Sequence, residues 1–173
     1  MVGVYEDFPE TYHSVARFSH RMPTGELQRV LIQSLYLLNQ SGRGVDLLEF
    51  AQDKILVSLE LGIAEGLTFN YIDRETLVDY QKRLRDQWLP TLDFLCVVRY
   101  YVVERTKQVP LRFDYYMLRF LFSDVEMEMR VFHEKGTRRL STEDLVNLLI
   151  ARINQGVAKK KLGPLKLIYM HAP

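Results

Sequence analysis

The side chains that could perform catalysis are few and lie far apart. Glu126 and Glu128 are two positions apart in an alternating segment, so on a strand their carboxylates would share one face about 7 Å apart. Paired acids can act as general acid and base. Arg130 continues the same face, which favours a charge-paired surface instead. Cys96 lies in the apolar run 94–98 without an adjacent basic residue, so we expect a small core residue rather than a nucleophile. The sequence therefore names no catalytic residue.

The histidines do not form a predicted metal site. The chain has four of them, His13, His20, His133 and His171. His13 and His20 are seven positions apart on an expected strand and would point to opposite faces, so they cannot bind one metal ion. His20 and His133 would meet if their strands paired, but a carboxylate ligand would still be missing. The motifs HExxH, CxxC, GxSxG and the Walker A sequence do not occur. We predict no metal and no cofactor.

Arginine and aromatic residues alternate along two expected strands. Arg99 shares a strand face with Tyr101, and Tyr115 shares one with Arg119. Such aromatic rings can stack on bases while arginines contact phosphates, which predicts RNA or single-stranded DNA binding as one function. The candidate residues are Arg99, Tyr101, Arg112, Tyr115, Arg119, Arg138, Arg139, Lys159, Lys160 and Lys161. The competing interpretation is that tyrosines cover a core while arginines extend to water.

Composition indicates an ordinary globular chain. Its 173 residues suit one domain, and 23 Lys and Arg against 22 Asp and Glu give a net charge of +1, unlike most globally basic nucleic-acid binders. The charge is uneven, because acids precede residue 11 and lysines 159–161 and 166 lie near the end. The single cysteine, the absence of a signal-peptide pattern and the absence of a long apolar run predict a cytoplasmic protein that does not enter a membrane.

The first half of the chain is expected to mix strands and helices. Alternation predicts a strand at His13–Met22, and apolar spacing of three and four predicts a helix at Glu26–Asn39. A short helical turn is expected at Asp46–Gln52. Residues Lys54–Asp73 favour a hairpin that turns at Gly62–Gly66, while one helix over Asp46–Glu65 fits the same residues.

The second half is expected to be mainly β. Asp73 is a predicted helix N-cap, and that helix reaches about Trp88. The expected strands are Leu92–Arg105, Leu111–Phe122 and Val125–Glu134, with Thr106–Pro110 as a connection, a helix that starts at Ser141 and a final strand at Leu165–Met170. The predicted fold is one α+β domain over residues 1–173, an antiparallel meander with about three helices mainly on one face. If 54–73 and 92–105 were helical, a mainly helical domain 1–108 would precede a small β-β-α-β domain 109–173.

The expected strand at 111–122 is apolar on both faces. One face carries Phe113, Tyr115, Met117 and Leu121, and the other carries Tyr116, Leu118, Phe120 and Phe122. An antiparallel strand with one solvated face would alternate apolar with polar residues, so both faces must be covered. Helices can cover one face, and the other requires N-terminal elements, a second copy or a ligand. We predict Tyr116, Leu118, Phe120 and Phe122 as an association face.

These patterns lead to one preferred function and two alternatives. The preferred function is a non-catalytic binding or assembly module that self-associates through a sheet face, as a homodimer, or binds a protein partner. The first alternative is nucleic-acid binding through the Arg/Tyr positions and the basic C-terminal segment. The second is a small-molecule or enzymatic pocket between sheet and helices, for which the sequence names no chemistry.

Overall fold

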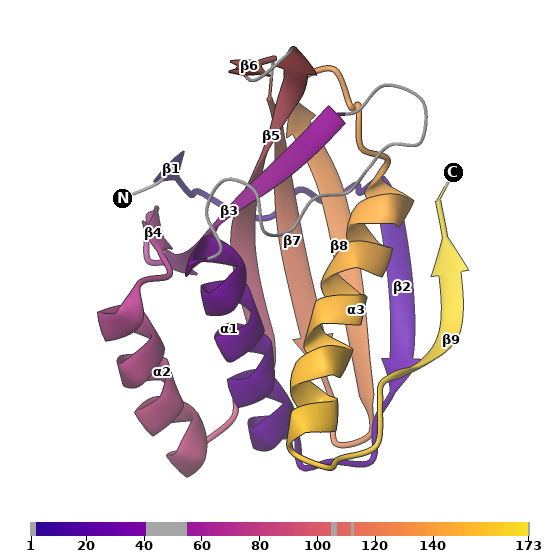
Figure 1. Ribbon diagram of the computed structural model, residues 1–173. Helices are drawn as coiled ribbons and strands as arrows, with labels where there is room; N and C mark the ends of the chain where they lie inside the picture. Colours follow the sequence, from indigo (N-terminus) through magenta and orange to yellow (C-terminus); the bar gives the residue numbers. More distant parts are fainter. Residues whose placement is uncertain (1–2, 41–54, 105–106, 112, 173) are drawn as a thin grey trace.

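A computed structural model describes residues 3–40, 55–104, 107–111 and 113–172 of the chain. Strands from both halves of the sequence form one antiparallel sheet, and three helices pack against one of its faces (Figure 1). The predicted α+β class is confirmed. We call the side covered by helices the helix face and the opposite side the back face.

The sheet contains nine strands within the described residues. Eight follow the order β1-β4-β3-β5-β7-β8-β2-β9, and β6 pairs with β5 off this path. The strands are β1 Gly3–Val4, β2 Ser14–Ser19, β3 Ile55–Glu65, β4 Thr68–Tyr71, β5 Thr91–Glu104, β6 Lys107–Pro110, β7 Asp114–Phe122, β8 Glu126–Lys135 and β9 Lys166–His171. The meander β5-β7-β8 matches the expectation, but the sequence did not reveal that β2 lies between β8 and β9.

In the part of the chain that the structure describes, three helices form the layer on the helix face: α1 Thr24–Gln40, α2 Arg74–Asp86 and α3 Thr142–Lys159. Two predicted N-caps are confirmed. An Asp73 carboxylate oxygen accepts a hydrogen bond from the Thr76 amide at 2.8 Å, and Ser141 Oγ accepts one from the Asp144 amide at 3.0 Å. Each side chain satisfies an amide that has no partner within its helix. Within the described residues, no helix is long and apolar enough to cross a membrane.

The hairpin interpretation of residues 54–73 is confirmed from Ile55 onward, because β3 and β4 pair antiparallel. The turn lies at Gly66, whose φ of +60° suits glycine, and not across Gly62–Gly66. The expected connection before Pro110 is also wrong in part, because Lys107–Pro110 forms β6. The helical turn predicted at Asp46–Gln52 lies outside the described residues.

The main core fills the space between the helices and the helix face. Tyr116, Leu118 and Phe120 are fully buried there, and Phe122 is only 8% exposed. The prediction of these four residues as an association face is therefore wrong. A doubly apolar strand does not reveal which of its faces the helices cover, and in this fold they cover this one.

The N-terminal segment covers much of the back face. It crosses behind the sheet from β1 to β2 (Figure 1). Phe8 lies in a second core with Phe69, Leu95, Val97 and Met117, flanked by Tyr5 and Tyr12. Of the three coverings that the sequence allowed, the structure contains the first, N-terminal elements.

Candidate functional site

A buried polar cluster joins β5, β7 and β8 to the loop before α3. Asp114, fully buried, accepts hydrogen bonds from Tyr100 Oη at 2.6 Å and His133 Nε2 at 2.8 Å. The backbone amides of Arg138 and Arg139 donate to the same carboxylate at 2.6 and 2.9 Å. We call Asp114, Tyr100 and His133 with these two amides the Asp114 cluster. It fixes the loop that leads into α3.

The electrostatics of the Asp114 cluster favour a carboxylate. Burial alone would raise the pKa of Asp114, but the hydrogen bonds from Tyr100, His133 and the two amides outweigh it and hold that pKa below its ordinary value. Burial and the bond to Asp114 raise the pKa of Tyr100, so its phenol stays protonated and donates. Four donors occupy the carboxylate oxygens. A carboxylate saturated in this way holds structure and has little capacity left to accept a proton from a substrate.

The strand register keeps His20 away from His133. β2 and β8 do pair, but Ser14 lies opposite Val131 and Ser19 opposite Glu126, so His20 sits at the far end from His133. It is His13 whose Nδ1 accepts a hydrogen bond from the His133 amide at 2.9 Å. Burial, then the charges of Arg138 and His133, lower the pKa of His13. His20 Nδ1 instead lies 2.9 Å from the Met22 carbonyl.

The other residues considered for catalysis, Glu128 and Cys96, have contacts that indicate structural roles. Glu128 binds Arg17 at 3.0 Å and Arg130 at 2.7 Å, so the predicted charge-paired surface is confirmed. Cys96 is fully buried, and burial raises the pKa of its thiol, which removes it as a nucleophile. Among the residues that the structure describes, no three His, Cys, Asp or Glu side chains are grouped to hold a metal ion.

The residues predicted to bind nucleic acid lie in separate places. Arg99, Tyr101, Tyr115 and Arg119 are on the back face, by alternation with Leu95, Val97 and Met117. There Arg99 pairs with Glu60 at 2.9 Å, and Lys135 lies over the Tyr115 ring. Arg138 and Arg139 belong to the loop before α3, while Lys159, Lys160 and Lys161 lie at the end of α3 on the helix face. Arg112 lies outside the described residues. The structure does not bring these residues together.

Arg119 fastens the N-terminal segment to the back face. Its guanidinium makes two bonds of 2.8 Å to Asp93, and the Tyr5 hydroxyl donates to the same carboxylate. The guanidinium also lies 4.9 Å from the centre of the Phe8 ring. Burial, then Asp93, raise the pKa of Tyr5 to about 12. Arg119, which the sequence analysis predicted as a phosphate contact, therefore holds the N-terminal segment on the back face.

Removing the Phe8 ring should loosen this clamp. Phe8 is only 6% exposed, so Phe8→Ala should lower the free energy of unfolding by about 3 kcal/mol, as for other buried rings. Urea titration measures the loss, and limited proteolysis should cut the N-terminal segment faster. Phe113→Ala is the control, because Phe113 is 45% exposed and should lose less than about 1 kcal/mol. Equal losses in both variants would contradict a buried role for Phe8.

The β9 strand is an exposed apolar edge. It pairs with β2 and ends the strand order, so its outer side has no partner strand among the described residues. Leu167, Ile168 and Tyr169 are 56, 52 and 51% exposed. The register skips Ile168, which forms a β-bulge. We call Lys166–His171 the β9 edge, and Figure 1 shows it at one side of the sheet, beside β2.

Sequence reasoning missed the Asp114 cluster, and it predicted the strand at Leu165–Met170, confirmed as β9, without recognising it as an exposed edge. An acid followed directly by an apolar strand, with Gly136 downstream, is the signal that could have pointed to Asp114. The signal for the β9 edge was the segment KLIYMH, whose central residues lack a charge. Comparison with known proteins finds no family model, no curated protein and no solved structure that matches this chain.

Proposed function

We propose that the chain is a non-catalytic assembly module that forms a two-fold homodimer by pairing the β9 edges of two copies. The observation that carries this proposal is the run of three large apolar side chains, each more than half exposed, on an edge strand. An edge strand offers unpaired backbone donors and acceptors to another strand. Proteins usually protect such edges with charges, and the centre of β9 carries none.

Charge favours a second copy in the antiparallel direction. Lys166 is the one Lys or Arg of the β9 edge and stands at its first position. Two antiparallel copies would hold their Lys166 side chains at opposite ends, about 17 Å apart along the strand, whereas parallel copies would bring them together. A two-fold axis makes the contact self-complementary and closed. The opposite edge, β1, has only two residues, which leaves little for a head-to-tail chain of copies.

The β-bulge at Ile168 shapes the expected contact. Bulges protect many edges because they interrupt regular pairing. Here the bulged residue, Ile168, is itself apolar and 52% exposed, so the bulge places an apolar side chain on the edge where other proteins place a charge. We therefore expect side chains to contribute to the dimer together with backbone hydrogen bonds, in a small and reversible interface.

Sedimentation equilibrium at micromolar concentrations tests the proposal. The wild-type chain should approach twice its mass of 20.4 kDa. Ile168→Lys should weaken the dimer at least about tenfold, because it buries a charge in the contact, and leave the circular dichroism spectrum unchanged.

Leu67→Lys is the matched control. It adds the same charge at a side chain that is 71% exposed, in the turn between β3 and β4 and away from β9. This variant should dimerise like the wild type. A wild-type monomer at 100 µM, a concentration at which weak specific dimers of about 10 µM affinity are well populated, would refute the proposal. A dimer that Ile168→Lys leaves intact would place the contact elsewhere.

A further inference from the structure

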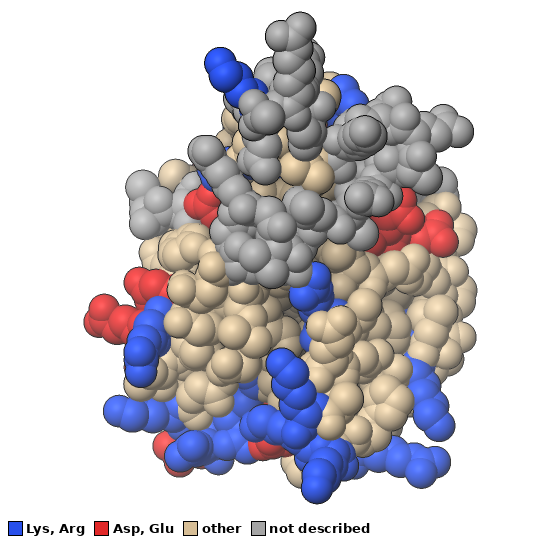
Figure 2. All heavy atoms as spheres, in the orientation of Figure 1, with Lys and Arg blue, Asp and Glu red and all other residues tan. Residues whose placement is uncertain are grey.

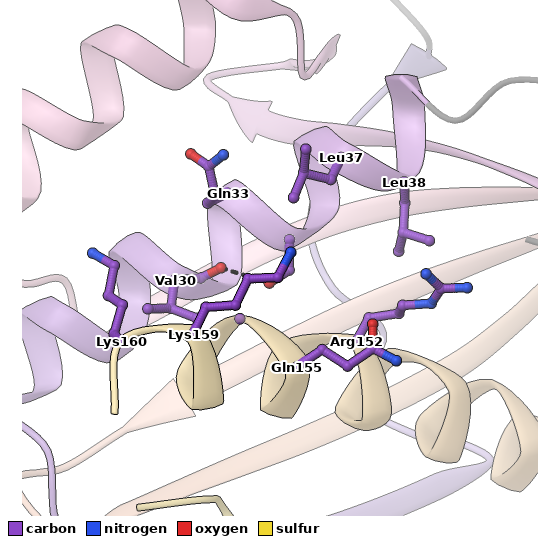
Figure 3. A pocket seen from close by; sticks show the side chains of 10 residues that line it. Val30, Gln33, Leu37, Leu38, Arg152, Gln155, Lys159 and Lys160 are labelled. Carbon is purple, nitrogen blue, oxygen red and sulfur yellow. Dashed lines mark hydrogen bonds between the residues drawn. The ribbon is translucent and has the colours of Figure 1, made fainter. Parts of the chain in front are cut away.

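A groove of about 420 Å³ lies between α1 and α3, away from the β9 edge. Val30, Ser34 and Leu37 line it from α1, and Arg152, Gly156 and Lys159 line it from α3 (Figure 3). The lining residues run over nine positions on each side, 30–38 and 152–160, which is about 12 Å or a little over two helical turns. The groove is therefore matched in length to two turns of a third helix laid along it.

Gly156 lets the two helices approach closely at the floor of the groove. A Cβ at this position would lie 3.0 Å from Ser34 Oγ and 3.0 Å from Val30 Cγ1. Ser34 Oγ donates to the Val30 carbonyl at 2.7 Å, so the serine hydroxyl is already satisfied inside its own helix. What remains exposed on the α1 side is the apolar side chain of Leu37, which is 47% exposed, beside the amide of Gln33.

The α3 side of the groove is cationic. Arg152, Lys159 and Lys160 line it, and no acid is among the described residues that line the groove. Lys160 Nζ binds Glu26 at 2.9 Å, whereas Lys159 is exposed and has no ion pair with any residue that the structure describes. In Figure 2 blue side chains gather at the lower end of the helix layer, where Figure 1 shows α2 and α3 ending. The groove therefore carries its exposed leucine on the α1 side and its basic residues on the α3 side.

We propose that this groove binds an acidic amphipathic helix of a partner protein. A helix presents apolar side chains at i, i+3, i+4 and i+7, which would pack on Leu37 and the floor over two turns. Acidic side chains beside that stripe would face Lys159, which gives charge complementarity at the C-terminal end of α3. A nucleic-acid strand suits the groove less well, because its phosphates would gain nothing from the exposed Leu37 side chain.

The test uses three labelled peptides of about 18 residues, long enough to form helix in water or on binding. One carries leucines at helical spacing with glutamate elsewhere, one replaces each glutamate by lysine, and one scrambles the acidic sequence. Fluorescence anisotropy measures binding to the full chain. The acidic amphipathic peptide should bind more tightly than either of the others, and added salt should weaken it.

Two variants locate the binding in the groove. Lys159→Glu should weaken the acidic peptide about fivefold, as for an exposed ion pair turned repulsive. Leu37→Ala should weaken it about tenfold through lost apolar contact. Both side chains are exposed, so circular dichroism should show folded variants. Lys82→Glu makes the same charge reversal on α2, at another exposed lysine, and should change nothing.

Other outcomes overturn the proposal. Equal binding of the acidic and lysine peptides, no binding of any, or binding that both groove variants leave intact would each refute it. A labelled single-stranded oligonucleotide is measured in parallel. If it binds, loses affinity in Lys159→Glu and keeps it in Leu37→Ala, while the acidic peptide does not bind, the occupant is nucleic acid instead. Ile168→Lys should keep peptide binding, so failure of the dimer and failure of the groove are separate results.

Discussion

Asp114→Asn is expected to lower the free energy of unfolding by about 3 kcal/mol or more. The buried carboxylate accepts four hydrogen bonds, and bonds to a charged group contribute more than neutral ones. Asparagine keeps the shape but turns one acceptor into an NH₂ group that would face donors. Urea titration at neutral pH measures the change, and Asp124→Asn, at an exposed acid, should be nearly neutral.

The same variant should alter the acid sensitivity of the fold. A carboxyl whose pKa is lower folded than unfolded stabilises the protein above the unfolded pKa, near 3.9 for aspartate. That stabilisation is lost as the pH falls from there through the folded pKa. The wild type should therefore lose stability steeply with acid below about pH 4, and Asp114→Asn should show a shallower slope there. An identical slope in the two proteins would contradict the charge assigned to Asp114.

Gly136→Ala is expected to destabilise the protein by about 3 kcal/mol or more, through strain and overlap together. Gly136 has φ +114°, a conformation that L residues rarely adopt. A Cβ there would lie 2.2 Å from Asp114 Oδ1 and 2.6 Å from the Phe113 carbonyl oxygen. The new methyl group would push directly against the Asp114 cluster.

Gly66→Ala is the control for a Cβ added at a positive φ without overlap. Gly66 also has a positive φ, +60°, but its added Cβ would meet nothing within 4 Å. This control should lose only about 1 kcal/mol, the strain of a left-handed residue. Thermal and urea unfolding of both variants give the comparison. Equal losses would show that backbone strain alone matters at Gly136 and that the contact with Asp114 does not.

Local signals in the sequence were sufficient for most of the elements. Asp73 and Ser141 cap their helices as expected because capping depends on residues within one turn. The dense β-branched and aromatic run at residues 97–103 forms β5 as expected, since such side chains suit a pleated surface. These are effects of neighbours along the chain, which is why a single sequence displays them.

Long-range contacts were beyond the sequence. Nothing local indicates that Arg17 lies opposite Glu128, more than a hundred positions away, or that Phe8 would pack on the back face. The periodicity of β7 shows that both of its faces are apolar but not which face the helices cover. For that reason Tyr116 is predicted on an association face, whereas it lies in the main core under the helices. The Asp114 cluster needs three strands and a loop to meet, so no short motif predicts it.

The place of β2 has a consequence for how the chain is made. Residues 14–19 pair with β8 on one side and with β9 on the other, so Arg17 lies opposite both Glu128 and Tyr169. A ribosome at work adds about 5–20 residues per second, so this early strand waits on the order of ten seconds for its partners to emerge. During that interval it is an unpaired strand that chaperones can bind. Completion of the sheet is thus a late, non-local and slow event in the life of each new molecule.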